Sequence, residues 1–401
     1  MSSPLDWFRE AGFGMFIHWG LNSLLGRDMM CQHAEAMPLD DYEALADRFC
    51  PASDCAAQWA RLAQRAGAKY VVFVSKHHDG FCLFDSAQTD YTTARHGPRR
   101  DYVREVTDAV RAEGLRVGLY YSLPDFHHPA YAQVGQHGDM SAAPGLREYL
   151  HGHVRELLTN YGKIDLLWYD GAAWATSFSG GTIPPEVLDS EGMNAMAREL
   201  QPGILINDRS GLPEDFYTAE NALTPPPPGR DWELCICIND LWGYNPHDYN
   251  YKTRNQLLFL LANCAVYGGN LLLNLGPRGD GSVPAPQIER LEQLGDWLAI
   301  HGESVYGVER LSQINFHAGR VTRKGRTLYF HAFYWPGEKM RVPALTEDTL
   351  QAAPGRCAMQ ARCLTTGQPA DAHWDGDVLE ITGLPADPPD QADTVVAVEI
   401  L

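Results

Sequence analysis

The 401-residue sequence lacks the segments that would take a protein to a membrane or to a nucleic acid. The stretch "MSSPLDWFREAGFGMFIHWG" has no basic segment ahead of an apolar one, and no apolar run reaches the length of a bilayer span. No dense group of Lys and Arg offsets the net charge of −19, which repels a phosphate backbone. We therefore expect a cytoplasmic protein with neither a membrane nor a nucleic-acid partner.

Two further absences narrow the chemistry. The nine cysteines are scattered without a CxxC pair, which disfavours a zinc ribbon or a redox motif and indicates reduced thiols. No GxGxxG follows the first expected strand, and GxxxxGK[ST] does not occur in the sequence. A doubly wound nucleotide-binding fold is therefore disfavoured.

Short apolar runs alternate with segments of helical periodicity, which is the pattern of βα units around a parallel sheet. Each run ends in polar or aromatic residues, and barrels of parallel strands gather their functional groups at the carboxyl ends of the strands. The sequence thus predicts a (β/α)8-like (TIM-type) barrel. Its expected strands cover 14–20, 69–75, 116–122, 164–170, 203–208, 232–238 and 270–276.

The composition changes after a helical stretch over 285–302. Short strand-like runs over 327–335, 377–384 and 394–401 follow, broken by Gly, Pro and Asp and without a long helical pattern. We expect a small C-terminal antiparallel β-sandwich. The predicted domains are a catalytic barrel over 1–309 and a β-sandwich over 310–401.

The motif "KHHDGF" places two adjacent histidines, His77 and His78, directly after a buried apolar run. Adjacent strand residues point to opposite faces, so the pair indicates the end of a strand and the edge of a site. Imidazole and indole nitrogens hydrogen-bond sugar hydroxyls, while aromatic faces pack on a pyranose ring. Together with His18 the pair is also a candidate metal site, although none of the three stands in an HxH or HExxH spacing.

Asp170 ends the apolar run "IDLLWYD", and a carboxylate there costs several kcal/mol unless it is paired or functional. It is either a loop cap or one half of a catalytic pair. Retaining glycosidases use two carboxyl groups roughly 5 Å apart. The candidate partners lie in "GLPEDFYTAENAL", read as a loop over 211–223, and they are Glu214, Asp215 and Glu220.

The motifs "FGMFIHWG", "KHHDGFCLFDS", "LLWYDG", "NLLLNLGPRGDGSVP" and "LGDWLAIHGESVYG" keep their order over roughly residues 6–310. Together they resemble the α-L-fucosidases of glycoside hydrolase family 29. This resemblance implies a retaining exo-acting hydrolase with a catalytic (β/α) barrel and a β-sandwich, which removes terminal α-L-fucose from a small glycoside or oligosaccharide.

The resemblance also implies roles for single residues. Asp170 matches the nucleophile, and Glu220 matches the acid/base, with Glu214 as the alternative. The residues expected to bind the sugar are His18, His77, His78, Tyr121, Trp168, Arg209 and Trp242. Neither a metal nor an organic cofactor is expected, and a homo-oligomer is left open.

One departure from the family pattern concerns the sugar pocket. Many members carry Glu-Trp after the first strand, where Met29 and Met30 stand here. Asp28 or His33 is a candidate to replace the lost polar contact. The departure leaves two alternatives open, which are a fucose-binding homologue with weak or no turnover and a glycosidase with altered sugar specificity.

Overall fold

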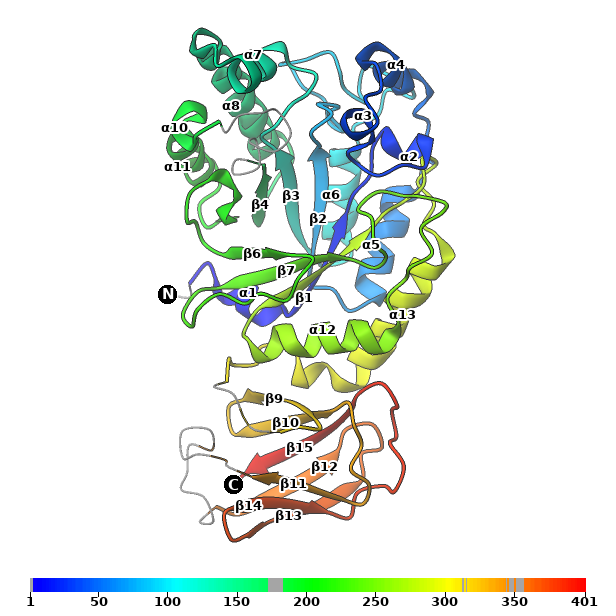
Figure 1. The fold of residues 1–401 in the computed structure, drawn as a ribbon, viewed down its shortest axis with the longest axis vertical. Helices are drawn as coiled ribbons and strands as arrows, with labels where there is room; N and C mark the ends of the chain where they lie inside the picture. The colour runs from blue at the N-terminus through cyan, green and yellow to red at the C-terminus, as the bar shows by residue number, and fades with distance from the viewer. Residues whose placement is uncertain are drawn as a thin grey trace.

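The computed structural model describes residues 3–171, 183–311, 314, 316–343, 345, 350 and 357–401. Figure 1 shows a curled parallel sheet covered by helices and, beyond helix α12, an antiparallel β-domain at the end of the chain. The predicted fold class is therefore confirmed. The domain boundary at 309/310 stays a prediction.

The barrel sheet has eight parallel strands in the order β5-β4-β3-β2-β1-β8-β7-β6. A parallel bridge between Asn207 and Phe216 joins the two edge strands, so the sheet curls back on itself. The strands are β1 Phe13–Ile17, β2 Tyr70–Lys76, β3 Arg116–Ser122, β4 Leu166–Asp170, β5 Leu205–Ile206, β6 Tyr217–Glu220, β7 Trp232–Cys237 and β8 Asn270–Leu275.

Amphipathic helices cover the outside of the barrel. In α5 the buried residues Ala56, Trp59, Ala60 and Ala63 recur at helical spacing and so form one apolar face. The α-helices of this region are α1 Asp6–Ala11, α2 Asn22–Leu25, α3 Cys31–Ala34, α4 Leu39–Glu43, α5 Cys55–Arg65, α6 Tyr102–Ala112, α7 Pro129–His137, α8 Ala143–Asn160, α10 Pro185–Leu188, α11 Ser190–Leu200, α12 Arg254–Val266 and α13 Ala285–His301. The 3-10 helices are η1 Ala44–Arg48, η2 Met140–Ala142, η3 Asp208–Ser210 and η4 Gly302–Ser304.

The regular alternation of strand and helix fails between β5 and β7. Residues 207–231 are all described, and they hold only η3 and β6. The expected loop over 211–223 is thus partly wrong, because Tyr217–Glu220 pairs with β7 as a short parallel strand. Glu220 accordingly ends a barrel strand, where side chains meet those of the neighbouring strands.

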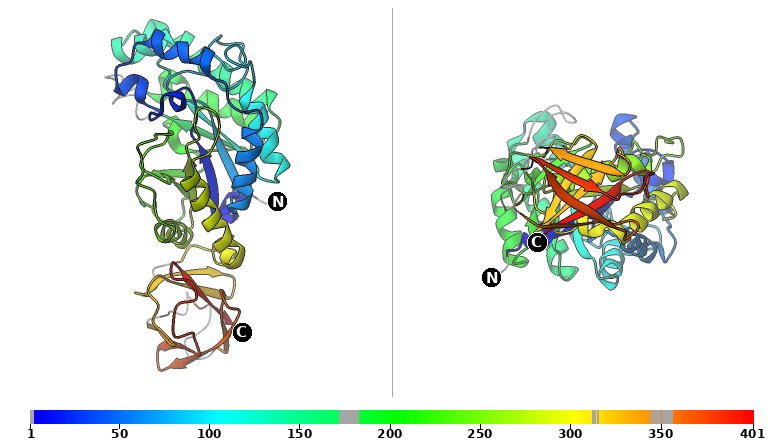
Figure 2. Two further views of the ribbon diagram at one scale, coloured as in Figure 1. Left: turned by 90° about the vertical axis from the view of Figure 1, so that its right-hand side faces the viewer. Right: turned by 90° about the horizontal axis from the view of Figure 1, so that it is seen from below.

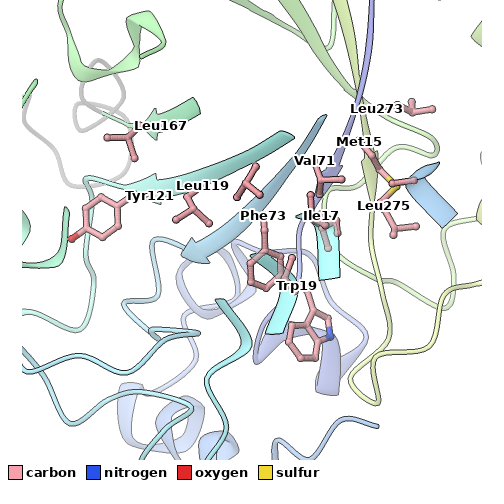
Figure 3. Close-up of a cluster of buried hydrophobic side chains, with 14 of the residues drawn as sticks. Met15, Ile17, Trp19, Val71, Phe73, Leu119, Tyr121, Leu167, Leu273 and Leu275 are labelled. Atoms are coloured by element: carbon pink, nitrogen blue, oxygen red, sulfur yellow. The ribbon is translucent and has the colours of Figure 1, made fainter. Parts of the chain in front are cut away.

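Alternate residues of the strands serve two different cores. Figure 3 shows Ile17, Phe73 and Leu119 among the side chains of the outer core, which also contains helix residues. The inner core lies within the barrel and contains Phe16 and Tyr70. Helix α1 contributes Phe8 to it, with the Phe8 and Phe216 ring centroids 4.7 Å apart. Phe16 of this inner core also lines a pocket at the carboxyl ends of the strands.

The C-terminal domain has seven antiparallel strands in the order β11-β14-β13-β12-β15-β10-β9. Strand β13 pairs with β12 at its start and with β14 from Asp371 to Asp375, and side chains from both parts share one core, as expected for a sandwich. The strands are β9 Gly319–Lys324, β10 Thr327–Ala332, β11 Lys339–Pro343, β12 Met359–Cys363, β13 Pro369–Asp375, β14 Val378–Thr382 and β15 Thr394–Ile400.

Helices α12 and α13 connect the two domains. Arg254 at the start of α12 donates to both carboxylate oxygens of Asp390, at 2.9 and 2.6 Å. Trp297 of α13 donates from Nε1 to the Asp393 carbonyl oxygen at 3.0 Å. The β-domain therefore packs on helices α12 and α13, which the side view in Figure 2 also shows. In the described part of the chain, no helix combines the length and apolar character needed to cross a bilayer.

Candidate active site

A pocket of about 90 Å³ opens at the carboxyl ends of the barrel strands. This volume is far below the roughly 300–1,000 Å³ of pockets that take drug-sized ligands, so it suits one small ring. Strands β1, β3, β4, β6 and β7 and the segments after β1, β2, β4, β5 and β7 contribute its walls. The lining residues are Phe16, His18, Asp28, Met29, Met30, His77, His78, Tyr120, Trp168, Asp170, Gly171, Arg209, Glu220, Cys235 and Trp242.

Two carboxylates of the pocket share one arginine. Nη1 of Arg209 donates to Oδ1 of Asp170 at 3.0 Å, and Nη2 lies 2.7 Å from Oε2 of Glu220. Asp170 ends β4 and Glu220 ends β6, while Arg209 lies in η3 between β5 and β6. One planar guanidinium therefore holds the two carboxyl groups close together on one wall of the pocket.

The environment of Asp170 favours its ionised form. Burial on its own raises the pKa of Asp170, but the charge of Arg209, the nearby His78 and hydrogen bonds from Tyr120 and Arg209 outweigh it and lower the pKa. The Tyr120 hydroxyl donates to Oδ2 of Asp170 at 2.8 Å. Burial and the charge of Asp170 raise the pKa of Tyr120 well above its ordinary value, so this hydroxyl stays a donor.

His18 presents one defined nitrogen for a ligand. Its Nδ1 lies 2.7 Å from Oδ1 of Asn274, whose amide nitrogen donates to the Trp242 carbonyl oxygen at 2.8 Å. The Asn274 oxygen must therefore accept from Nδ1–H, which leaves Nε2 of His18 as an acceptor. Burial lowers the pKa of His18 to about 4, so the ring is neutral at pH 7.

The hydrogen bonds of His78 fix its tautomer in the same way. The Ser122 hydroxyl donates to the Pro124 carbonyl oxygen at 2.6 Å, so its oxygen accepts from Nδ1–H of His78 at 2.5 Å. Nε2 of His78 is then an acceptor and lies 3.7 Å from Oδ2 of Asp170. Burial lowers the pKa of His78 to about 4 as well.

His77 lies beside His78, although the two are adjacent in sequence. Their ring centroids are 4.1 Å apart, and His77 stacks on Tyr120 at 5.6 Å. Burial lowers the pKa of His77 well below its ordinary value. Both rings line the pocket because β2 ends at Lys76 and the alternation of strand faces ends with it.

The turn after the two histidines is held by buried charge and a glycine. Lys76 and Asp125 are both fully buried and form an ion pair at 2.9 Å, which connects the end of β2 to the segment after β3. Gly80 has a φ of +80°, and a Cβ there would lie 2.5 Å from Oδ1 of Asp125. The lysine and the glycine of "KHHDGF" therefore fix its backbone, while its histidines line the pocket.

Met29 and Met30 form an apolar part of the pocket wall. Asp28 also lines the pocket, and its Oδ1 accepts a hydrogen bond from the Gly243 backbone N–H at 3.0 Å. His33 stacks on Phe126 with ring centroids 5.1 Å apart and does not line the pocket. Of the two candidate replacements for the lost polar contact, Asp28 is the one that the structure places at the site.

The described ranges contain no group of three or more His, Cys, Asp or Glu side chains arranged to hold a metal ion. The expectation that no metal takes part stays a prediction.

The family model described as alpha-L-fucosidase matches residues 2–303. The chain belongs to this family.

Tissue alpha-L-fucosidase of Mus musculus is 30% identical over 437 residues, which cover 99% of this chain and 91% of the mouse protein. Alpha-L-fucosidase isoenzyme 1 from Paenibacillus thiaminolyticus has 34% identity and a TM-score of 0.87, with 99% of both chains covered. A trapped covalent intermediate of a family 29 alpha-L-fucosidase from Bacteroides thetaiotaomicron, in complex with 2-fluoro-fucosyl fluoride, has 25% identity and a TM-score of 0.84 over 100% of this chain and 97% of that one. The predicted enzyme class, a glycoside hydrolase of the α-L-fucosidase type, is confirmed, whereas no comparison supports the cytoplasmic location.

The structure brings together most of the residues that the family resemblance implied. The pocket contains Asp170, Glu220, His18, His77, His78, Trp168, Arg209 and Trp242. Glu214 lies elsewhere, because its carboxylate contacts Asn194 at 2.6 Å and Arg198 at 2.7 Å and thereby connects to α11. The geometry therefore favours Glu220 over Glu214 as the partner of Asp170.

The placement of Tyr121 in the sugar pocket is wrong, and Tyr120 takes this place. Tyr121 is fully buried in the outer core, where Figure 3 shows it with Leu119 and Leu167, and its hydroxyl lies 2.9 Å from Nδ1 of His153. The reason is the two-residue alternation of a strand. Tyr120 pairs in register with Trp168, and Ser122 pairs with Asp170, so even-numbered residues of β3 face inward.

The adjacent residues Tyr120 and Tyr121 provide a matched pair of variants. Tyr120→Phe removes the hydrogen bond to Asp170, and we expect kcat/KM for an aryl α-L-fucoside to fall roughly ten- to a hundredfold with little change in Tm. Tyr121→Phe leaves Nδ1 of His153 without its partner, and we expect a loss of about 1–3 kcal/mol in stability with normal kcat/KM. Steady-state kinetics and urea denaturation of both variants measure this, and the reverse pattern would restore Tyr121 to the site.

The buried histidines predict a loss of stability in acid. An unfolded histidine binds a proton with a pKa near 6.5, whereas folded His18 and His78 resist protonation until about pH 4. Each therefore contributes stability above pH 6.5 that is lost as the pH falls toward 4. We expect His78→Gln to lose roughly 2–3 kcal/mol less than the wild type over this interval. Urea denaturation across pH measures this, with the exposed His247→Gln as control. An identical acid loss in His78→Gln and wild type would contradict it.

Proposed function

We propose that this family member is a retaining exo-α-L-fucosidase in which Asp170 is the nucleophile and Glu220 the general acid and base. The observation that carries the proposal is the shared contact of Arg209 with both carboxylates. Side chains that share one guanidinium lie close together, which favours the roughly 5–5.5 Å spacing of retaining enzymes over the wider spacing of inverting ones. The trapped covalent intermediate of the Bacteroides relative supports the same mechanism.

In the first step, Asp170 attacks the anomeric carbon while Glu220 donates its proton to the leaving oxygen. The hydrogen bonds from Tyr120 and Arg209 keep Asp170 ionised and fix the direction of its oxygens. Arg209 also contacts Oε2 of Glu220 at 2.7 Å and so holds the acid beside the nucleophile.

In the second step, Glu220 removes a proton from the water that hydrolyses the glycosyl-enzyme ester. Esterification has by then removed the charge of Asp170, so Arg209 faces Glu220 as its remaining carboxylate. The guanidinium therefore stays in contact with the carboxyl group that accepts the proton.

The remaining pocket residues suit recognition of a deoxy sugar. His18 and His78 offer Nε2 acceptors for hydroxyl groups, and Trp242 offers an aromatic face for an apolar part of the ring. Met29 and Met30 add an apolar surface. We propose a fucosylated glycoside or oligosaccharide as substrate, turned over without metal or organic cofactor, in a cytoplasmic protein.

The stereochemical course tests this function. We expect the first product released from an aryl α-L-fucoside to be the α-anomer, observed by NMR before mutarotation. Asp170→Ala should lower kcat on the order of 10⁴-fold or more, with Asp215→Ala as a control carboxylate outside the pocket. A β-configured first product would refute the retaining mechanism. Binding of fucose without turnover of any α-L-fucoside would instead support the binding-protein alternative.

The role of Glu220 is tested by leaving groups. In Glu220→Ala, we expect a substrate with an acidic phenol as leaving group to lose roughly tenfold less in kcat/KM than one with an alkyl alcohol, because the acidic phenol leaves without protonation. Glu214→Ala is the matched control and should affect both substrates equally. Equal losses for both substrates in Glu220→Ala, with a graded loss in Glu214→Ala, would move the acid role to Glu214.

A further inference from the structure

A buried carboxyl group lies beneath the pocket without lining it. Glu233 of β7 is fully buried, and its side chain crosses the barrel interior to two other strands. Its Oε2 accepts from the Tyr70 hydroxyl of β2 at 2.7 Å, and its Oε1 accepts from Nε1–H of Trp168 of β4 at 2.6 Å. Neither strand is a neighbour of β7 in the sheet.

The surroundings of Glu233 are unfavourable for an ionised carboxyl group. Both hydrogen bonds that it accepts come from neutral groups. Burial raises the pKa of Glu233 to about 7, even though Tyr70, Trp168 and the charge of Arg209 act in the opposite direction. An apolar residue would fill the barrel interior without this cost, so the carboxyl group calls for a reason beyond packing.

The contacts of Trp168 supply that reason. The Trp168 ring stacks on Tyr120 with centroids 5.5 Å apart, and the guanidinium of Arg209 lies 4.9 Å from its centroid. Among the described residues, Tyr120 and Arg209 are the two whose side chains donate to Asp170. Both donors to Asp170 therefore rest against one indole ring, and the one polar atom of that ring is bonded to Glu233.

We propose that Glu233 is a positioning residue, which fixes the plane of Trp168 and, through it, the donors Tyr120 and Arg209 around Asp170. The inference rests on the proposed role of Asp170 as nucleophile. Trp168 precedes Asp170 by two residues on β4, so a rotation of its ring displaces groups on the same wall of the pocket. Small displacements at a reacting centre cost large factors in rate.

Two substitutions separate geometry from charge. Glu233→Gln loses the charge but keeps the reach, because its amide oxygen can accept from Trp168 while its amide nitrogen donates to the Tyr70 oxygen. Glu233→Asp keeps the charge but shortens the side chain by one methylene, which withdraws the acceptor from Trp168. Positioning therefore predicts that the Gln variant is active and the Asp variant is impaired.

We expect Glu233→Asp to lower kcat for an aryl α-L-fucoside roughly ten- to a hundredfold, with a smaller change in KM. Glu233→Gln should stay within about threefold of the wild type. Tyr70→Phe is the control, because it removes the other partner of Glu233 and leaves the bond to Trp168; its kcat should also stay within about threefold of the wild type. All kinetics are measured below the Tm of each variant.

The same pair in a Trp168→Phe background completes the test. Without the indole N–H, the difference in kcat between Glu233→Asp and Glu233→Gln should disappear. A difference that persists, a Gln variant weaker than the Asp variant, or losses in Tm alone with normal kcat would each overturn the inference while leaving the proposed function intact. A wild type that turns over no α-L-fucoside would overturn the proposed function and this inference with it.

Discussion

The site depends on one arginine placed between two carboxylates. Arg209 is itself largely buried, and its pKa is raised because the charges of Asp170 and Glu220 outweigh the effect of burial. Without this cation, two carboxylates would face each other in a pocket whose histidines are neutral, and their repulsion would be uncompensated. The barrel strands bring the three groups together from β4, η3 and β6, which lie at the place where the sheet curls onto itself.

Neutral histidines complete this arrangement. Nδ1 of His18 hydrogen-bonds Asn274, and Nδ1 of His78 hydrogen-bonds Ser122. Asn274 and Ser122 each donate in turn to a backbone carbonyl oxygen, which fixes their orientation. The neutral form of both histidines is therefore set by the folded barrel itself, without a ligand. Asp170, Arg209 and Glu220 lie together on one wall and Asp28 lies beside the two methionines, while the other lining residues present acceptors and aromatic rings.

The sequence predicted the barrel strands well because their apolar runs are uninterrupted, and it predicted the site because parallel strands end on the same side. The family resemblance placed Tyr121 where Tyr120 stands, and a run such as "YYS" does not by itself reveal which residue faces inward. The pairing of β3 with β4, a non-local property, decides this. Strand β6 was missed because it is short and polar and forms only against its neighbours. Glu233 was hidden in "WELCICI", where nothing local distinguishes a carboxyl group that crosses the barrel.

The apolar wall formed by Met29 and Met30 has a chemical consequence of its own. Thioethers are oxidised to sulfoxides, which converts a flexible apolar side chain into a polar one with a fixed new oxygen. Met29 is nearly inaccessible, whereas Met30 is partly exposed at the pocket, so an oxidant reaches the second residue first. A family member with glutamate and tryptophan at these positions offers no thioether there. Peroxide would thus alter this pocket at a point where glutamate and tryptophan have no sulfur to oxidise, and a methionine sulfoxide reductase could restore it.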